Sequence, residues 1–218
     1  TPKPSSAASD VYKRQLDSPS VTGAYQFVLK PGARTVLDVD ARVFARKNVD
    51  KIGFAPMSSM FLYGQNRSPW FDDFRPQVHD SDGLLIHTAG NDWIWRPLRN
   101  GPGVNVTLFS GPLPKGFGLL QRQRTFDSYL DVEAKYHKRP SEWIMPRKGD
   151  WGNGHIELLE YSTVSEFNDN IAAYWVPDEP FRAGESRQYS YSIRMFDDRR
   201  PEQDVARVKN MRNGWDTL

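Results

Sequence analysis

Short stretches in which apolar and polar residues alternate recur along the chain and predict β-strands. In residues 34–44, RTVLDVDARVF, the apolar positions alternate with charged ones, as in an antiparallel strand with one buried face. Pro31-Gly32 separates this stretch from an apolar run over residues 23–29, which predicts a hairpin. Further short runs, with Gly and Pro between them, predict an all-β fold, an antiparallel β-sandwich or barrel. These runs lie at residues 84–87, 93–95, 104–109, 116–124 and 189–195.

Three segments depart from this pattern. Phe126, Tyr129 and Leu130 recur at helical spacing and predict one short helix over residues 126–137. Residues 64–83 are polar and irregular, and a loop of that length inside a compact domain is often functional. Residues 198–218 are charged and lack a strand period, so they are expected to form a linker.

Residues 157–177 combine two predicted strands with a polar turn that contains Glu166, Asn168, Asp169 and Asn170. Loops carried on a rigid sheet commonly hold functional side chains. Asn-Asp-Asn is also typical of a simple turn, because Asx side chains bond to nearby backbone and tolerate left-handed conformations. We expect Asn168 and Asn170 to hold the bend that presents Asp169.

Composition removes several classes of chemistry. The chain has 218 residues and no cysteine, which excludes disulfides, a thiol nucleophile and a thiolate metal site. Its four histidines are scattered and fit no metal motif, so no metal and no cofactor is predicted. No apolar run approaches the roughly 18 residues of a membrane span, so no membrane insertion is predicted either.

The net charge of +2 comes from the first 15 residues, and the remainder carries equal numbers of basic and acidic side chains. A phosphate-backbone binder needs a basic stripe, so no nucleic-acid partner is expected. Residues 1–15 are rich in Pro, Ser and Ala and resemble translated adapter sequence. They are therefore expected to be a disordered or artefactual tail that packs against nothing.

Paired carboxylates are the best-supported chemistry. Asp80, in His79-Asp-Ser-Asp-Gly83, and Asp169 each lie in a polar loop beside an aromatic-rich strand. Glycoside hydrolysis uses one carboxylic acid to protonate the leaving oxygen and a second group to activate water. Aromatic rings stack on sugars while polar groups bond the hydroxyls; for each ring alone, packing in the core is the simpler interpretation. The candidate sugar-binding residues are Trp70, His79, Trp93, Trp95, Arg96, Arg122, Trp151 and Tyr174.

Longer blocks carry a family resemblance. LDSPSVTGAYQFVLKPG, FRPQVHDSDGLLIH, GFGLLQRQRTFDSYLD, GDWGNGHIELLE and NDNIAAYWVP occur in order between residues 16 and 198. They resemble consecutive blocks of the periplasmic glucan biosynthesis proteins G and D. The resemblance implies a galactose-mutarotase-like β-sandwich (supersandwich), of which residues 16–197 would be the C-terminal half. Residues 198–218 would lead toward an immunoglobulin-like domain.

The same resemblance implies roles for residues. Proteins of the D type are inverting endo-β-1,2-glucanases of the bacterial periplasm. Their scheme makes Asp169 the general acid and Asp80 the general base acting through water, with Glu166 lining the same site. A general acid must hold its proton at neutral pH, and like-charge repulsion from Glu166 would help Asp169 to do so.

Two functions stay open at this point. One is a β-1,2-glucan-processing enzyme, for which residues 16–197 alone are expected to be inactive because a missing half would carry part of the cleft. The other is a non-catalytic binding or assembly factor for osmoregulated periplasmic glucan, a β-glucan polysaccharide, working with the glucan-synthesising membrane machinery. A scaffold without a sugar site is a third, weaker interpretation. The resemblance does not separate the G type from the D type.

Overall fold

The computed structural model describes residues 9–65 and 71–197. Within these residues every pair of neighbouring strands is antiparallel, which confirms the predicted all-β, antiparallel class. The strands are β1 (Asp10–Asp17), β2 (Val21–Lys30), β3 (Thr35–Ala45), β4 (Phe54–Ser59), β5 (Phe61–Tyr63), β6 (Val78–His79), β7 (Gly83–His87), β8 (Trp93–Pro97), β9 (Val104–Gly111), β10 (Gly116–Leu120), β11 (Ser141–Gly149), β12 (Gly154–Tyr161), β13 (Ile171–Pro177) and β14 (Ser186–Phe196).

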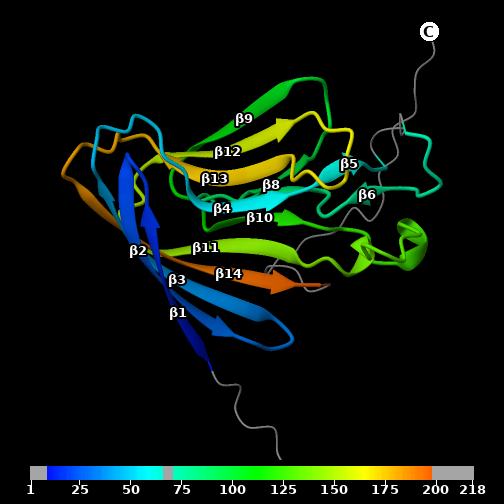
Figure 1. Ribbon diagram of the computed structural model, residues 1–218, viewed down its shortest axis with the longest axis horizontal. Helices are drawn as coiled ribbons and strands as arrows, with labels where there is room; N and C mark the ends of the chain where they lie inside the picture. The colour runs from blue at the N-terminus through cyan, green and yellow to red at the C-terminus, as the bar shows by residue number, and fades with distance from the viewer. Residues whose placement is uncertain (1–8, 66–70, 198–218) are drawn as a thin grey trace, which may run out of the picture.

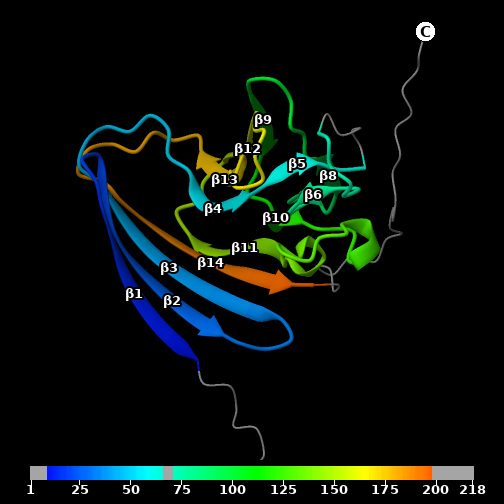
Figure 2. The same cartoon turned by 45° about the vertical axis from the view of Figure 1, so that its right-hand side comes forward.

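Two sheets face each other, and a small third sheet lies at one end (Figure 1). The large sheet has eight strands in the order β1-β2-β3-β14-β11-β10-β7-β8. The second sheet has four, in the order β4-β13-β12-β9, and β5 pairs with β6 in the third. In the turned view β1 and β2 curve away beyond the four-stranded sheet, so the two layers overlap only in part (Figure 2).

The main core lies between the two large layers. Phe117 and Ile144 of the eight-stranded sheet and Ile156 and Trp175 of the four-stranded sheet are all buried in one cluster. Strand alternation sends successive side chains to opposite faces. Val39, Ala41 and Val43 of residues 34–44 follow this rule, because all three are buried in this cluster.

A second apolar cluster lies around β5 and β6 and supports the polar loops at that end. It joins Met60, Tyr63 and Val78 to Tyr129 and Tyr136 from the segment between β10 and β11. Figure 1 shows that segment beside β5 and β6. The loops before β7 and after β12 therefore start from packed strand ends rather than from free chain.

The helix expected over residues 126–137 is replaced by two separate 3₁₀ turns, η1 (Phe126–Ser128) and η2 (Tyr136–Lys138). The positive φ angles of Leu130 and Lys135, 52° and 54°, break the backbone between them. Of the three apolar residues at helical spacing, Tyr129 packs into the second cluster, whereas Phe126 and Leu130 are exposed, so the spacing does not mark one buried helix face.

The tail expected over residues 1–15 is corrected for residues 10–15. β1 pairs with β2 along its whole length, from Asp10 opposite Leu29 to Asp17 opposite Thr22. Its side chains are nearly all exposed, so no apolar period marks the strand. Backbone bonding to an otherwise open sheet edge holds it. Residues 1–8, and the expected linker over 198–218, lie outside the described residues.

In the part of the chain that the structure describes, no helix is long and apolar enough to cross a membrane.

Candidate active site

Asp80 occupies a loop that is bonded to strands on both sides. The Asp80 backbone N–H donates to Met60 O at 2.8 Å, and that of Asp82 donates to Leu120 O at 2.8 Å. The hydroxyls of Ser59 and Ser81 bond at 2.9 Å. The loop is therefore fixed by the fold itself, and the Asp80 side chain is left 26% exposed.

The charges around Asp80 oppose one another. Burial raises the pKa of Asp80, the Arg139 guanidinium lowers it, and the negative charge of Asp169 raises it again. Arg139 Nε lies 3.4 Å from Asp80 Oδ1. Because the charge of Asp169 acts on Asp80, the two carboxylates predicted from sequence share one electrostatic environment although 89 positions separate them in the chain.

The Asp169 loop is held by the residue that follows Asp169. Asn170 is fully buried. Its Oδ1 accepts from Phe61 N at 2.9 Å, and its Nδ2 donates to Phe61 O and Tyr161 O at 3.1 and 3.0 Å. The Tyr161 hydroxyl donates to the backbone oxygen of Asp169. The carboxylate itself is exposed and accepts one long bond, 3.4 Å, from Ser58 Oγ.

Asn168 bonds within the loop, where its Nδ2 donates to Thr163 Oγ1 at 3.1 Å. The expectation that Asn168 and Asn170 hold the bend around Asp169 is confirmed. Asn170 anchors the loop more firmly than Asn168, because Asn170 bonds it to β5 and β12 whereas Asn168 bonds only to another residue of the same loop.

Glu166 is bonded to a cation. Arg75 donates to both of its oxygens at 3.0 Å, and the Tyr136 hydroxyl donates to Oε2 at 2.5 Å. These bonds lower the pKa of Glu166 and outweigh its partial burial. Glu166 is thus an anion paired with Arg75, and its repulsion of Asp169 stays a prediction.

Glu142, on β11, was not singled out from the sequence. It pairs in register with Leu119 of β10. Burial raises its pKa, and the charge of Asp80 raises it further. A third carboxyl therefore belongs to the environment of Asp80. Its position directly before the apolar run Trp143-Ile-Met145 was a signal that could have marked it.

The predicted sugar-binding residues are not gathered into one groove. His79 is fully buried beneath Asp80, with its ring stacked on Phe61 and its Nε2 3.1 Å from Gln77 Oε1. Burial lowers the pKa of His79, so the ring is neutral. Trp151 is 3% exposed within the main core, which removes its ring from contact with a ligand. Trp70 lies outside the described residues.

The remaining predicted contacts belong to the sheets. Arg96 bridges the two layers through Glu160 at 2.8 Å. Trp93 and Trp95 pack in a third apolar cluster on the outer face of the eight-stranded sheet, with the Arg122 guanidinium 5.5 Å from the Trp95 ring centre. The Tyr174 hydroxyl donates to Glu157 Oε1 at 2.6 Å on the outer face of the four-stranded sheet. Burial, together with this bond, raises the pKa of Tyr174 to about 12.

Comparison with known protein families identifies the family of this chain. The family model described as "Periplasmic glucan biosynthesis protein, MdoG" matches residues 1–217. This chain belongs to that family.

Curated members of the family give the same result. The chain is 51% identical over 178 residues to the glucans biosynthesis protein G of Pseudomonas paraeruginosa strain PA7, covering 82% of this chain and 34% of the relative. It is 47% identical over 193 residues to the protein of the same name from Pseudomonas entomophila strain L48, covering 88% and 33%. The chain thus spans about a third of the length of the relatives it matches.

Within this member of the glucan biosynthesis family, the sequence-based prediction missed the residues that organise the site. Arg75 contacts three carboxylates, those of Asp73, Asp131 and Glu166. Tyr136 bonds Glu166 of this cluster, and Arg139, three residues further along, contacts Asp80. The density of charge in residues 72–82 was visible in the sequence, but the partners come from segments about 60 and 90 positions further along.

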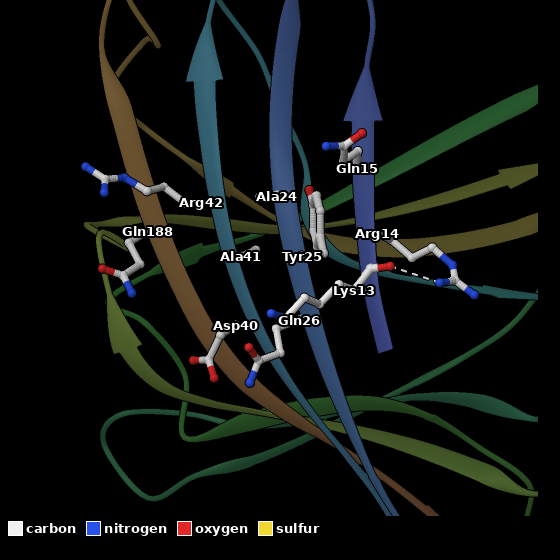
Figure 3. Close-up of a pocket in the computed structure, with 10 residues that line it drawn as sticks. All are labelled: Lys13, Arg14, Gln15, Ala24, Tyr25, Gln26, Asp40, Ala41, Arg42 and Gln188. Atoms are coloured by element: carbon white, nitrogen blue, oxygen red, sulfur yellow. Dashed lines mark hydrogen bonds between the residues drawn. The ribbon is translucent and has the colours of Figure 1, made fainter. Parts of the chain in front are cut away.

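Hollows formed by described residues open at two places on the surface. One, of about 580 Å³, lies between residues 72–75 and 130–133 and is also lined by Glu166. The other, of about 610 Å³, lies on the outer part of the large sheet, where longer polar side chains surround Ala24 and Ala41 (Figure 3). Among its lining residues Asp40 is the one carboxylate, and Ser190 and Arg147 already contact it. The first hollow adjoins the predicted acid loop and is the better candidate.

No group of three or more metal-ligating side chains occurs among residues 9–65 and 71–197.

Proposed function

We propose that this chain supplies the carboxylate-bearing half of a glucan site in the periplasm, which acts on β-1,2-glucan as an inverting endo-glucanase. The observation that carries the proposal is that the two loops meet at neighbouring residues of β4, where Ser58 bonds Asp169 and Ser59 bonds Ser81 beside Asp80; the charge of Asp169 accordingly contributes to the raised pKa of Asp80. Membership of the periplasmic glucan biosynthesis family supports the compartment and the class of substrate.

In this mechanism Asp169 gives its proton to the glycosidic oxygen as the bond to the anomeric carbon breaks. Asp80 takes a proton from a water molecule, whose oxygen forms the new bond on the opposite side of that carbon. The anomeric configuration is inverted, and the two carboxyls must stand roughly 6.5–9.5 Å apart to leave room for the water. Each turnover leaves Asp169 ionised and Asp80 protonated, and exchange with solvent restores both.

The surroundings of the two carboxyls suit these assignments. A base with a raised pKa binds the proton of water more strongly, and the Arg139 guanidinium limits how far the pKa of Asp80 rises. Asp169 is exposed, so its conversion into an acid depends on the bound glucan, which would exclude water and favour the neutral carboxyl.

The test is to incubate the full-length protein with linear β-1,2-glucan and to follow new reducing ends. We expect Asp169→Asn and Asp80→Asn each to lower the rate by about 10²–10⁴-fold, the usual contribution of a general acid or base. Asp178→Asn removes a comparable exposed carboxylate from the other end of β13 and should leave the rate unchanged. Unchanged activity in Asp169→Asn would remove Asp169 as the acid, and retention of configuration in the first product would exclude the inverting mechanism.

The alternative is a non-catalytic factor that binds and positions glucan beside the synthesising membrane machinery. The exposure of Asp169 favours this alternative, because nothing in the described part of the protein shields that carboxylate from water. It predicts binding of β-1,2-glucan without new reducing ends, and equal affinity in the wild type and Asp169→Asn. Binding by calorimetry, combined with the reducing-end assay on the same samples, separates the two functions.

A further inference from the structure

Arg75 is bonded to three carboxylates beside the proposed site. Its guanidinium donates to Asp73 Oδ2 at 2.7 Å, to Asp131 Oδ2 at 2.6 Å and to both oxygens of Glu166 at 3.0 Å. Its side chain is 16% exposed, and those of Asp131 and Glu166 are 5% and 23% exposed. Charge-assisted bonds at such partly buried positions are stronger and more directional than ion pairs on the open surface.

We propose that Arg75 is the positioning residue of the glucan site: it fixes Glu166 as an oriented anion and holds the segment that carries Tyr136 and Arg139 against Asp80. This inference rests on the proposed function for its catalytic consequence. Its structural part, the control of Glu166 and of residues 130–139, stands without it.

The first step of the argument concerns charge. Three carboxylates surround one cation, and without that cation their mutual repulsion would drive protonation or separation. Arg75 lowers the pKa of Asp73, Asp131 and Glu166, although burial acts against it in each case. Glu166 is thereby kept ionised and accepts a short hydrogen bond from the Tyr136 hydroxyl.

The second step concerns the backbone between the two 3₁₀ turns. Leu130 and Lys135 both adopt the left-handed conformation, with φ of 52° and 54°, which is unfavourable for residues with a Cβ. Asp131 holds this turn, because its Oδ1 accepts from the N–H groups of Ala134 and Lys135 at 2.6 and 3.0 Å. Its other oxygen bonds Arg75, so the strained turn is fastened to the rest of the protein through that guanidinium.

The third step connects this turn to the carboxylate at the proposed reaction centre. Tyr136 directly follows the strained turn and bonds Glu166. The Arg139 guanidinium lies 5.7 Å from the Tyr136 ring centre and 3.4 Å from Asp80 Oδ1. A displacement of residues 130–139 would therefore withdraw the cation that lowers the pKa of Asp80.

The primary test compares the wild type with Arg75→Gln and Arg75→Lys in the full-length protein. Side-chain carboxyl carbons of Glu166 and Asp131 are followed by NMR through a pH titration. We expect both pKa values to rise toward the ordinary carboxylate range in Arg75→Gln. Arg75→Lys should recover only part of the shift, because an ammonium group cannot bond three carboxylates in the planar geometry of the guanidinium. Unchanged pKa values in Arg75→Gln would overturn the inference.

Asp131→Asn serves as the second variant if Arg75→Gln fails to fold. An Asn side chain can still accept the two backbone N–H groups but loses the charged bond to Arg75. Amide hydrogen exchange in residues 130–139 should become faster in this variant. Arg147→Gln is the matched control, because Arg147 contacts Asp38 and Asp40 on the large sheet and should leave exchange in residues 130–139 at the wild-type rate. Equal protection of these amides from exchange in Asp131→Asn and the wild type would contradict the role of Arg75 in holding residues 130–139.

The catalytic consequence has its own measurement. On linear β-1,2-glucan, Arg75→Gln should lower kcat by about a hundredfold, as small displacements of reacting groups do. It should also move the acidic limb of the pH–rate profile to higher pH, because Arg139 would no longer lower the pKa of Asp80. If the wild type releases no reducing ends, the proposed function fails while the NMR and exchange results still decide the role of Arg75. An active Arg75→Gln protein with an unchanged pH profile would overturn the positioning role while leaving the proposed function intact.

Discussion

The loops of Asp80 and Asp169 are built in opposite ways. The Asp80 loop is fastened by backbone hydrogen bonds to Met60 and Leu120, and its carboxylate is mostly buried. The Asp169 loop is fastened by one buried side chain, that of Asn170, and its carboxylate faces solvent. One carboxyl thus obtains its environment from the fold, and the other must obtain it from whatever binds.

This difference fits a division of labour between a base and an acid. A base needs a permanent, partly desolvated position with a nearby cation, which Arg139 supplies to Asp80. A general acid needs to hold its proton only when substrate is present, and an exposed carboxyl can gain that property on binding. If the two loops were equivalent, each would respond equally to the changes described below.

The largest effect is expected from Asn170→Ala. The substitution leaves Phe61 N, Phe61 O and Tyr161 O without their partner in a fully buried position. At about 1 kcal/mol for each bond, the free energy of unfolding should fall by about 3 kcal/mol. Urea denaturation measures it. Asn168→Ala, which removes one bond near the surface, should cost about 1 kcal/mol or less, and equal losses would show that the loop is not anchored through Asn170.

Asp80→Asn should make the protein more stable at neutral pH. Burial raises the Asp80 pKa, so the folded protein binds this proton more tightly than the unfolded chain does. Stability therefore falls as the pH rises through the range between the unfolded and the folded pKa. The neutral side chain avoids this loss, and we expect a gain of about 1 kcal/mol, which disappears below about pH 3, where the wild-type carboxyl is also neutral.

The control for this gain is Asp169→Asn, which should change stability by less than about 0.5 kcal/mol because that carboxylate is exposed. Urea denaturation of both variants at several pH values gives the two curves. A gain of the same size in Asp169→Asn would contradict the contrast between the two loops.

The smallest effect tests whether the carboxylates share a site. Removing the negative charge in Asp169→Asn should lower the pKa of Asp80, since that charge is one of the causes that raise it. Because burial is the larger cause, most of the displacement should stay. An NMR titration of the Asp80 carboxyl carbon measures the change, with Asp178→Asn as the control. An Asp80 pKa identical in Asp169→Asn and the wild type would place the two groups in separate environments.

The sequence predicted the strands well because burial of one sheet face leaves a period of two, as in β3 and β14. β1 was not predicted, because backbone pairing with β2 holds it while its exposed side chains show no apolar alternation. The helix over 126–137 was wrong because, of the three apolar residues at helical spacing, only Tyr129 is buried, and the backbone turns at Leu130 and Lys135.

The site was predictable only in part. Asp80 and Asp169 stood out because each lies in a polar loop within a longer block that resembles the family. Arg75 and Glu142 did not, because their importance depends on neighbours brought close by folding. The aromatic contacts were the least reliable prediction, since a tryptophan in a core such as Trp151 and one in a groove have the same sequence signature.

Gly83 ends the same short block that presents Asp80, yet its reason for being glycine lies elsewhere. A Cβ at this position would stand 2.3 Å from the Trp95 ring, so the indole covers the bare backbone. Substitutions at the two positions are therefore coupled during evolution: a larger residue fits at position 83 only after residue 95 has become smaller. A change at either position in a relative should be accompanied by a change at the other, although neither residue takes part in the proposed chemistry.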